Sequence, residues 1–233
     1  MPALPHSDPD WKGRLEPVYR LYAAMARGMD PALGLGGKLL YAGELHEDGC
    51  RLVRAANIAG AASLSATADP TALRHANRDG VADFLVTTLD EALRILKNEI
   101  RKRQTVSVGV SIAPATIEAE MRERGVLPDL LPPAAWGMEE NANFPYFLAR
   151  GARCIELAPS AKEIHFEVWA PAPADFEKLA MTALAENDHT NRRWVRLSPR
   201  YLGPAARRVR SAAGPARTMA KLAEATGARS GPS

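Results

Sequence analysis

Short apolar runs alternate with longer segments of helical spacing over residues 37–132, and this alternation restricts the fold more than any other feature. Each run is too short for a helix and has the composition of a strand buried on both faces. The runs are Lys38–Ala42, Ala62–Ala66, Asp83–Val86 and Val106–Ser111, with a shorter fifth near Val126–Leu131. Leucine and isoleucine recur every three or four residues over 89–100, which places them on one helix face. The pattern predicts an α/β fold, a mainly parallel sheet with flanking helices.

The length of 233 residues suits one α/β domain with appendages. We predict a helical lead-in over residues 1–35 and a sheet domain with added strands over 36–170. Beyond the sheet we expect a C-terminal α+β extension, and a basic helical arm covers 171–233. No run of about 18 apolar residues occurs, so we expect no membrane span. The amino terminus lacks a secretory pattern and the two cysteines lack metal spacing, so we expect a reduced, cytoplasmic protein.

Charge is distributed unevenly along the chain. Residues 192–233 carry ten Lys and Arg and one acid, whereas the remainder has a net charge of −6. Aromatic and basic residues interleave from Arg192 to Arg210. Such a segment can bind an acidic partner or a polyanion such as single-stranded nucleic acid, or lie on an anionic surface. It can equally be a packing arm that docks on its own acidic domain, with arginine stems covering apolar surface.

The turn after the first strand carries acids where a nucleotide-binding fold has glycines. A pyrophosphate is bound there by backbone N–H groups and a helix N-terminus. In Gly43–Gly49 only the two terminal glycines remain, and Glu44, Glu47 and Asp48 lie between them. Acids help to start a helix, and they repel a pyrophosphate. Together with His46 these acids could bind a metal, but their spacing is not diagnostic, and we predict no metal site.

Polar residues follow the second and third strands. Asp69 lies about 20 residues beyond Gly49, where an acid would hold a ribose hydroxyl, yet before Pro70 it is also an ordinary helix N-cap. Thr88 and Glu91 have the spacing of a capping box. These strand ends should gather at one edge of the sheet, where we expect any small-molecule ligand.

Two further groups are candidates beyond the fifth strand. Polar residues between 137 and 145 could line a pocket beside that edge or be solvated; they are Glu139, Glu140, Asn141 and Asn143. His165 and Glu167 share one face of a predicted strand and form either an acid/base pair or an exposed cross-strand pair. Cys50 and Cys154 are expected to be small buried residues rather than nucleophiles.

Several segments, in order and with matching spacing, resemble the central Rossmann-like domain of urocanase (urocanate hydratase) over roughly residues 36–131. They are Gly37–Leu39, Ala55–Leu64, Thr88–Ala92 and Arg124–Asp129. The resemblance implies a doubly wound Rossmann-like fold. It also implies a tightly bound NAD that acts as an electrophile in the addition of water to urocanate, and hence a lyase (hydratase) activity.

The sequence departs from the family at the positions that would contact NAD. The family's glycine-rich turn falls on Glu44–Gly49, and its acid after the second strand falls near Thr67, leaving Asp69 as a shifted substitute. The cofactor-contacting candidates are therefore Gly43, Glu44, Gly49, Thr67 and Asp69. No counterpart of the family's catalytic cysteine is found.

Three functions follow from this departure. We expect that the chain does not bind NAD. It would be a remodelled ligand-binding or non-catalytic descendant of the family that does not hydrate urocanate by itself. Such a protein could form a homo-oligomer. The alternatives are a lyase of this family acting on another small substrate, and a polyanion- or partner-binding protein that acts through its basic arm.

Overall fold

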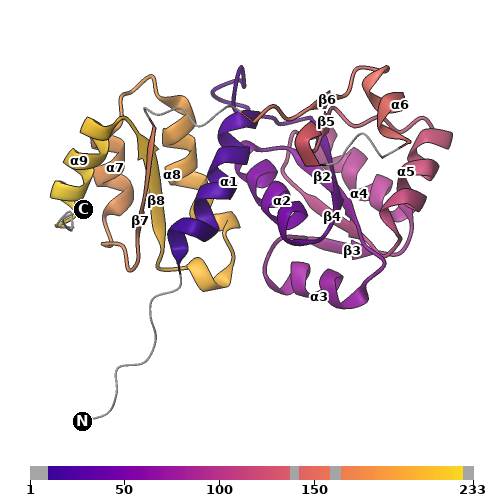
Figure 1. Ribbon diagram of the computed structural model, residues 1–233, viewed down its shortest axis with the longest axis horizontal. Helices are drawn as coiled ribbons and strands as arrows, with labels where there is room; N and C mark the ends of the chain where they lie inside the picture. The colour runs from indigo at the N-terminus through magenta and orange to yellow at the C-terminus, as the bar shows by residue number, and fades with distance from the viewer. Residues whose placement is uncertain (1–9, 137–141, 158–163, 228–233) are drawn as a thin grey trace, which may run out of the picture.

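The computed structural model describes residues 10–136, 142–157 and 164–227 (Figure 1). Its main feature is a six-stranded sheet in the order β3-β4-β2-β1-β5-β6, in which every neighbouring pair is parallel. The strands are β1 (Leu39–Glu44), β2 (Ala62–Ala66), β3 (Phe84–Val86), β4 (Ser107–Val110), β5 (Leu130–Leu131) and β6 (Arg153–Cys154). The predicted Rossmann-like α/β fold is confirmed.

Helices cover both faces of this sheet. One face packs on α1 (Trp11–Met25), α2 (Glu47–Ala59) and α3 (Pro70–Arg78), and the other on α4 (Leu89–Arg101), α5 (Pro114–Glu123) and α6 (Phe144–Leu148). Alternate residues of β1 point to opposite faces of the sheet. Leu40 packs in the same cluster as α1, α2 and α3, and Leu39 and Tyr41 pack in the same cluster as α4, α5 and α6. The central strands β2 and β4 are buried along their whole length, as expected for strands covered on both faces, whereas the edge strand β3 leaves Phe84 and Leu85 exposed.

The chain beyond the sheet forms a second, smaller layer (Figure 1). Its elements are β7 (His165–Trp169), α7 (Phe176–Ala183), α8 (His189–Tyr201), η3 (Pro204–Ala206), β8 (Arg210–Gly214) and α9 (Ala216–Ala225). Strand β7 was expected among the added strands of the sheet domain, but it pairs antiparallel with β8. Strand β8 lies within the arm that was predicted to be helical, because its Ser-Ala-Ala-Gly lacks the β-branched and aromatic residues typical of strands.

Helix α1 joins the two layers. It contacts α2 on one side and β7 on the other, and in Figure 1 it stands between the sheet and the C-terminal elements. It begins at Trp11, because the Asp10 carboxylate accepts a hydrogen bond from the Gly13 N–H at 2.8 Å and caps the helix. Pro17 therefore lies inside the helix.

An aromatic cluster fills the junction between the layers. The Trp194 ring, fully buried on α8, has its centroid 5.2 Å from that of Tyr19, 5.4 Å from Tyr22 and 6.1 Å from Phe166. Tyr19 Oη donates to Asn191 Oδ1 at 2.7 Å. Because the cluster combines α1, β7 and α8, the C-terminal segment is part of the hydrophobic core and not a free arm.

The buried tyrosines make stability sensitive to alkaline pH. Burial is the main cause that raises the pKa of Tyr19, Tyr22 and Tyr41 far above its usual value, and the Glu118 carboxylate adds to the shift for Tyr41. Above the unfolded pKa of about 10, the unfolded chain loses phenolic protons that the folded chain retains. The free energy of unfolding should then fall by up to about 1.4 kcal/mol per pH unit for each tyrosine, and should not depend on these groups below about pH 10.

Urea unfolding from about pH 9 to about pH 11.5 measures this slope. The Tyr22→Phe variant is the matched control. Its free energy of unfolding should fall less steeply with pH, because one of the three tyrosines no longer titrates. An unchanged slope in that variant would contradict the assignment.

Candidate functional site

The carboxyl ends of the parallel strands meet at one edge of the sheet. The strand order reverses between β1 and β5, and ligands of open α/β sheets bind at such a point. The two strand ends lie close together there, since a Cβ placed on Gly43 would be 4.0 Å from Cγ of Pro132. Gly43 itself has a φ of +74° next to a register shift in β1. Glycine adopts a positive φ without strain, which explains why glycine occupies this position.

Gly49 is required by packing within the same turn. A Cβ on this residue would lie 1.8 Å from the carbonyl oxygen of Glu44. The Glu44 side chain is exposed, whereas Leu45 is buried and donates its N–H to Ala66 O at 3.1 Å. The turn is thus folded tightly onto the first turn of α2.

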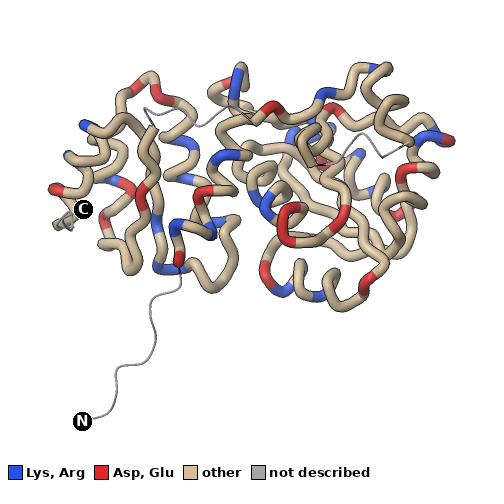
Figure 2. Tube along the Cα trace, viewed as in Figure 1, with Lys and Arg blue, Asp and Glu red and all other residues tan. Residues whose placement is uncertain are grey.

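The N-terminus of α2 is occupied by the chain's own side chains. His46 Nδ1 accepts from the Gly49 N–H at 3.1 Å and caps the helix. Glu47 and Asp48 follow in the first turn, and Arg51 donates to both carboxylates, at 2.7 Å to Asp48 Oδ1. Acidic positions surround this turn in Figure 2. These carboxylates therefore interact favourably with the positive end of the helix dipole.

The other two candidate cofactor residues have structural partners. Thr67 is buried, and its Oγ1 accepts from the Asp69 N–H at 3.1 Å. Asp69 is the N-cap of α3, with Oδ1 accepting from the Thr71 N–H at 2.7 Å and Pro70 at the start of the helix. The helix-cap interpretation of Asp69 is confirmed, while a ribose contact stays a prediction.

The predicted capping box before α4 is half confirmed. Thr88 Oγ1 accepts from the Glu91 N–H at 3.2 Å. The Glu91 carboxylate reaches back one residue further than expected, to the Thr87 N–H at 2.9 Å and its hydroxyl at 3.1 Å. These bonds lower the pKa of Glu91.

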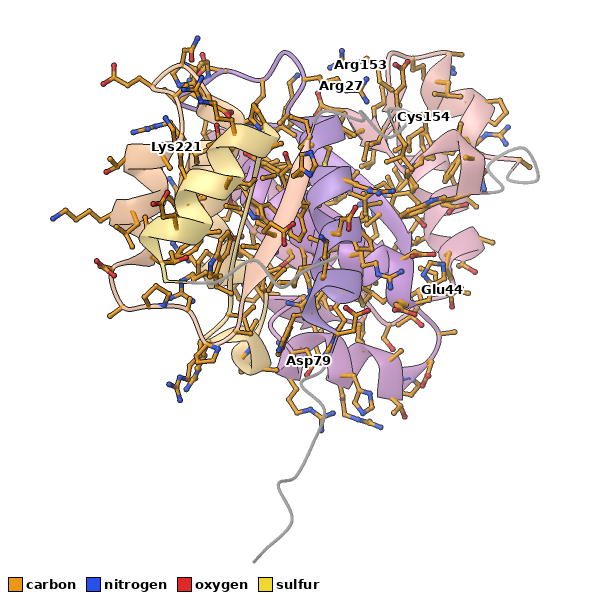
Figure 3. The ribbon with its side chains drawn as sticks, turned by 60° about the vertical axis from the view of Figure 1, so that its left-hand side comes forward. Arg27, Glu44, Asp79, Arg153, Cys154 and Lys221 are labelled. Atoms are coloured by element: carbon orange, nitrogen blue, oxygen red, sulfur yellow. The ribbon has the colours of Figure 1, made fainter. Side chains whose placement is uncertain are left out.

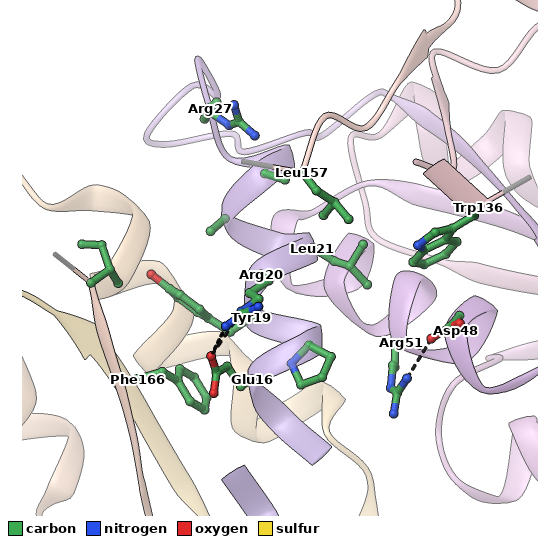
Figure 4. A pocket seen from close by; sticks show the side chains of 14 residues that line it. Glu16, Tyr19, Arg20, Leu21, Arg27, Asp48, Arg51, Trp136, Leu157 and Phe166 are labelled. Atoms are coloured by element: carbon green, nitrogen blue, oxygen red, sulfur yellow. Dashed lines mark hydrogen bonds and ion pairs between the residues drawn. The ribbon is translucent and has the colours of Figure 1, made fainter. Parts of the chain in front are cut away.

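A cavity of about 500 Å³ opens beside this edge, between α1, the start of α2 and β7 (Figure 4). We call it the junction cavity. Aromatic rings, aliphatic side chains and ion-paired charges line it: Glu16, Pro17, Tyr19, Arg20, Leu21, Ala23, Ala24, Arg27, Asp48, Arg51, Trp136, Leu157, Ile164 and Phe166. Figure 4 shows the α1 side chains on one side and Trp136, Asp48 and Arg51 on the other. Leu157 and Ile164 are 42% and 43% exposed, which leaves apolar surface at its rim.

The carboxylates of the junction cavity are already paired. Arg20 donates to Glu16 at 2.6 Å and Arg51 to Asp48 at 2.7 Å. Arg27 donates to the carbonyl oxygen of Glu156. The cavity therefore combines apolar surface with oriented guanidinium groups and holds each of its two acids in an ion pair.

Most other candidates from the sequence are dispersed. Glu139, Glu140 and Asn141 lie outside the described residues, and Asn143 precedes α6. Glu167 is ion-paired with Lys12 at 3.4 Å, and no hydrogen bond to His165 occurs in the described chain, so the exposed-pair interpretation fits better.

Neither cysteine has the environment of a nucleophile. Cys50 and Cys154 are half-buried, not fully buried as expected, and burial raises the pKa of both thiols. Within the described ranges, no three His, Cys, Asp or Glu side chains come together as a possible metal site.

Some arginines of residues 192–210 bond to backbone carbonyls of other elements, and others are exposed. Arg192 donates to the carbonyls of Met181 and Leu184, and Arg193 to the carbonyl of Ile58. These bonds attach α8 to the rest of the molecule. The exposed members are Arg196, Arg200, Arg207 and Arg208. No helix of the described chain is long and apolar enough to cross a bilayer.

Tyr41 and Glu118 form a buried pair that was not among the candidates predicted from the sequence. Tyr41 Oη donates to Glu118 Oε1 at 2.8 Å between β1 and α5, and Glu118 is 2% exposed. The available signal was helical spacing: Glu118 lies three residues before Met121 and next to Ile117, on the apolar face of α5. The pair lies on the opposite face of the sheet from the junction cavity.

The sheet order and its switch point define a protein of the Rossmann-like α/β class. A family model described as the urocanase Rossmann-like domain matches residues 14–134, which is more than half of the chain. The chain therefore belongs to the urocanase family. The match starts within α1, so the family-like part begins earlier than the resemblance over residues 36–131 indicated.

The geometry of the β1–α2 turn bears on NAD, the cofactor that the family implies. A pyrophosphate needs free backbone N–H groups at this helix N-terminus. Here the Gly49 N–H is bonded to His46, and the carboxylates of Glu47 and Asp48 stand in the first turn. These residues do not fit the phosphate groups of a dinucleotide.

Proposed function

We propose that this chain is a ligand-binding member of the urocanase family that does not use NAD and does not hydrate urocanate by itself. The observation that carries the proposal is the self-capped, acidic N-terminus of α2 beside the junction cavity. His46 takes the place of a phosphate oxygen as the acceptor for the Gly49 N–H, at 3.1 Å. Glu47 and Asp48 share the single cation Arg51, so one negative charge remains at the turn, and this charge repels a pyrophosphate.

The ligand class follows from the lining of the junction cavity. Its volume of about 500 Å³ suits a small metabolite. Tyr19, Trp136 and Phe166 supply aromatic surface, and Arg27 supplies a guanidinium group that forms no ion pair in the described part of the chain. An aromatic or apolar molecule that carries a carboxylate matches this combination.

Binding without catalysis is favoured over a lyase reaction on another substrate. A general acid or base needs a proton-transfer group that is free to meet the substrate. The two carboxylates that line the cavity, Glu16 and Asp48, are each held by an arginine at 2.6 Å and 2.7 Å.

Native mass spectrometry of the purified full chain tests the proposal. We expect a retained small molecule or, when a panel of aromatic carboxylates is added, one bound molecule per chain. The Trp136→Ala variant should lose the bound molecule, because the ring lines the cavity. The control Arg74→Ala changes an exposed residue of α3 and should retain the bound molecule. A chain that binds none of these molecules, or that consumes urocanate as followed by its absorbance, would refute the proposal.

A further inference from the structure

A second cavity, of about 540 Å³, lies at the opposite, amino-terminal edge of the sheet. It is bordered by the glycine-rich loop of residues 28–38, the end of α4 and the start of β6, and we call it the basal cavity. Figure 3 places Arg153, at the start of β6, far from Glu44, which marks the carboxyl edge. Four of its lining residues are basic: Lys38, Arg101, Arg103 and Arg153.

Three of these cations have no carboxylate partner within the described ranges. Lys38 is ion-paired with Asp129 at 2.8 Å, whereas Arg101, Arg103 and Arg153 form no ion pair there. The side chain of Arg101 donates only a long bond, 3.4 Å, to Asn98 Oδ1. These three exposed arginines line one concavity, so an anion placed there would be attracted by all of them.

The one acid among the described lining residues points into its own loop. Asp30 Oδ1 accepts from the N–H groups of Ala32 and Leu33, at 2.9 and 2.7 Å. The Asp30 carboxylate therefore stabilises the turn of its own loop and does not pair with the arginines. The described lining has four cations against this single carboxylate.

The backbone at Arg103 is unusual for an arginine. Its φ is +57°, and it is the one non-glycine residue with a positive φ in the described chain. Glycine normally occupies this position after a helix, and here Gly60, Gly80 and Gly125 follow α2, α3 and α5 in the same way. An arginine held at this strained position keeps a guanidinium group on the basal cavity, and such outliers cluster at functional sites.

The glycines of the neighbouring loop allow the arginine to approach. A Cβ on Gly36 would lie 3.2 Å from Cβ of Arg103, and one on Gly37 would lie 3.7 Å from its Cγ. Packing against Arg103 thus explains Gly36, whereas the φ of +92° explains Gly37. The loop forms one wall of the basal cavity.

We propose that the basal cavity binds a small molecule carrying two or more phosphate groups. Guanidinium groups bind phosphate oxygens in pairs of parallel hydrogen bonds, and three of them unpaired suit a polyphosphate better than a single carboxylate. A concave site of this volume admits a di- or triphosphate group, whereas an extended polyanion would favour a flat or grooved basic surface. This site is separate from the junction cavity and does not depend on the function proposed for it.

Calorimetric titration of the full chain with inorganic tripolyphosphate tests this site. We expect one bound tripolyphosphate per chain and affinity that falls with added salt. Arg103→Gly and Arg153→Ala should each weaken binding by about tenfold or more, because each removes a bidentate donor. The control Lys97→Ala removes an exposed cation of α4 outside the cavity and should leave affinity within about twofold.

Arg103→Gly separates binding from folding. Glycine adopts a positive φ without strain, so this variant should melt at or above the temperature of the unchanged chain while losing affinity. The proposal is overturned if tripolyphosphate gives no binding heat, if Lys97→Ala weakens binding as much as Arg103→Gly, or if a single-stranded oligonucleotide binds more tightly than tripolyphosphate.

Discussion

Replacing Trp194 by alanine is expected to lower the free energy of unfolding by about 3–5 kcal/mol, the range for a large aromatic side chain removed from a core. Trp194 is fully buried and packs against three rings of α1 and β7. Its Nε1 also donates to Ser211 Oγ at 3.0 Å, which ties α8 to β8. The melting temperature should fall by about 6–20 °C for a chain of this size.

Trp11→Ala is the matched control for this change. Trp11 is half-buried at the start of α1, where the Arg14 guanidinium lies 5.0 Å from its ring centroid. Its loss should lower the melting temperature by much less. If Trp194→Ala melts within about 2 °C of the unchanged chain, the C-terminal elements are not part of the core described above.

Gly49→Ala should destabilise the chain by about 1–3 kcal/mol or more, although glycine to alanine inside a helix normally stabilises by about 0.5–1 kcal/mol. The new methyl group would lie 1.8 Å from the Glu44 carbonyl oxygen, so backbone must move. Chemical denaturation measures both the size and the sign of the effect.

Gly43→Ala separates backbone strain from steric overlap in the same turn. Its φ of +74° costs an alanine about 1–2 kcal/mol, but the nearest atom to its Cβ, Cγ of Pro132, is 4.0 Å away. We expect this variant to be milder than Gly49→Ala. A stabilising Gly49→Ala would show that the turn is looser than described and would leave its glycine available for a phosphate.

The parallel sheet could be predicted because its determinants are local. Buried strands need continuous apolar runs, and the run Ala62–Ala66 matches β2 residue for residue. The helix ends that carry a cap were also predictable, since Asp69 and Thr88 bond to N–H groups two or three residues away. The start of α1 is harder to predict, because proline favours a first helical turn and Pro17 lies inside the helix, six residues after its start at Trp11.

Features made by distant residues could not be predicted in this way. The pairing of β7 with β8 joins His165 to Gly214, and nothing local in the small residues of β8 indicates it. The basal cavity likewise depends on the fold, which brings the end of α4 and the start of β6 to one place. The acidic turn was visible in the sequence, but the bond from the Gly49 N–H to His46 that completes it was not.

Calorimetric titration of the purified chain with NAD tests the central claim most directly. The claim is that His46, Glu47 and Asp48 replace the backbone surface that a dinucleotide needs at the switch point of the sheet. We expect no binding heat up to millimolar NAD. Micromolar binding that is lost in Gly49→Ala, with the dinucleotide lying over Gly43–Gly49, would contradict this account.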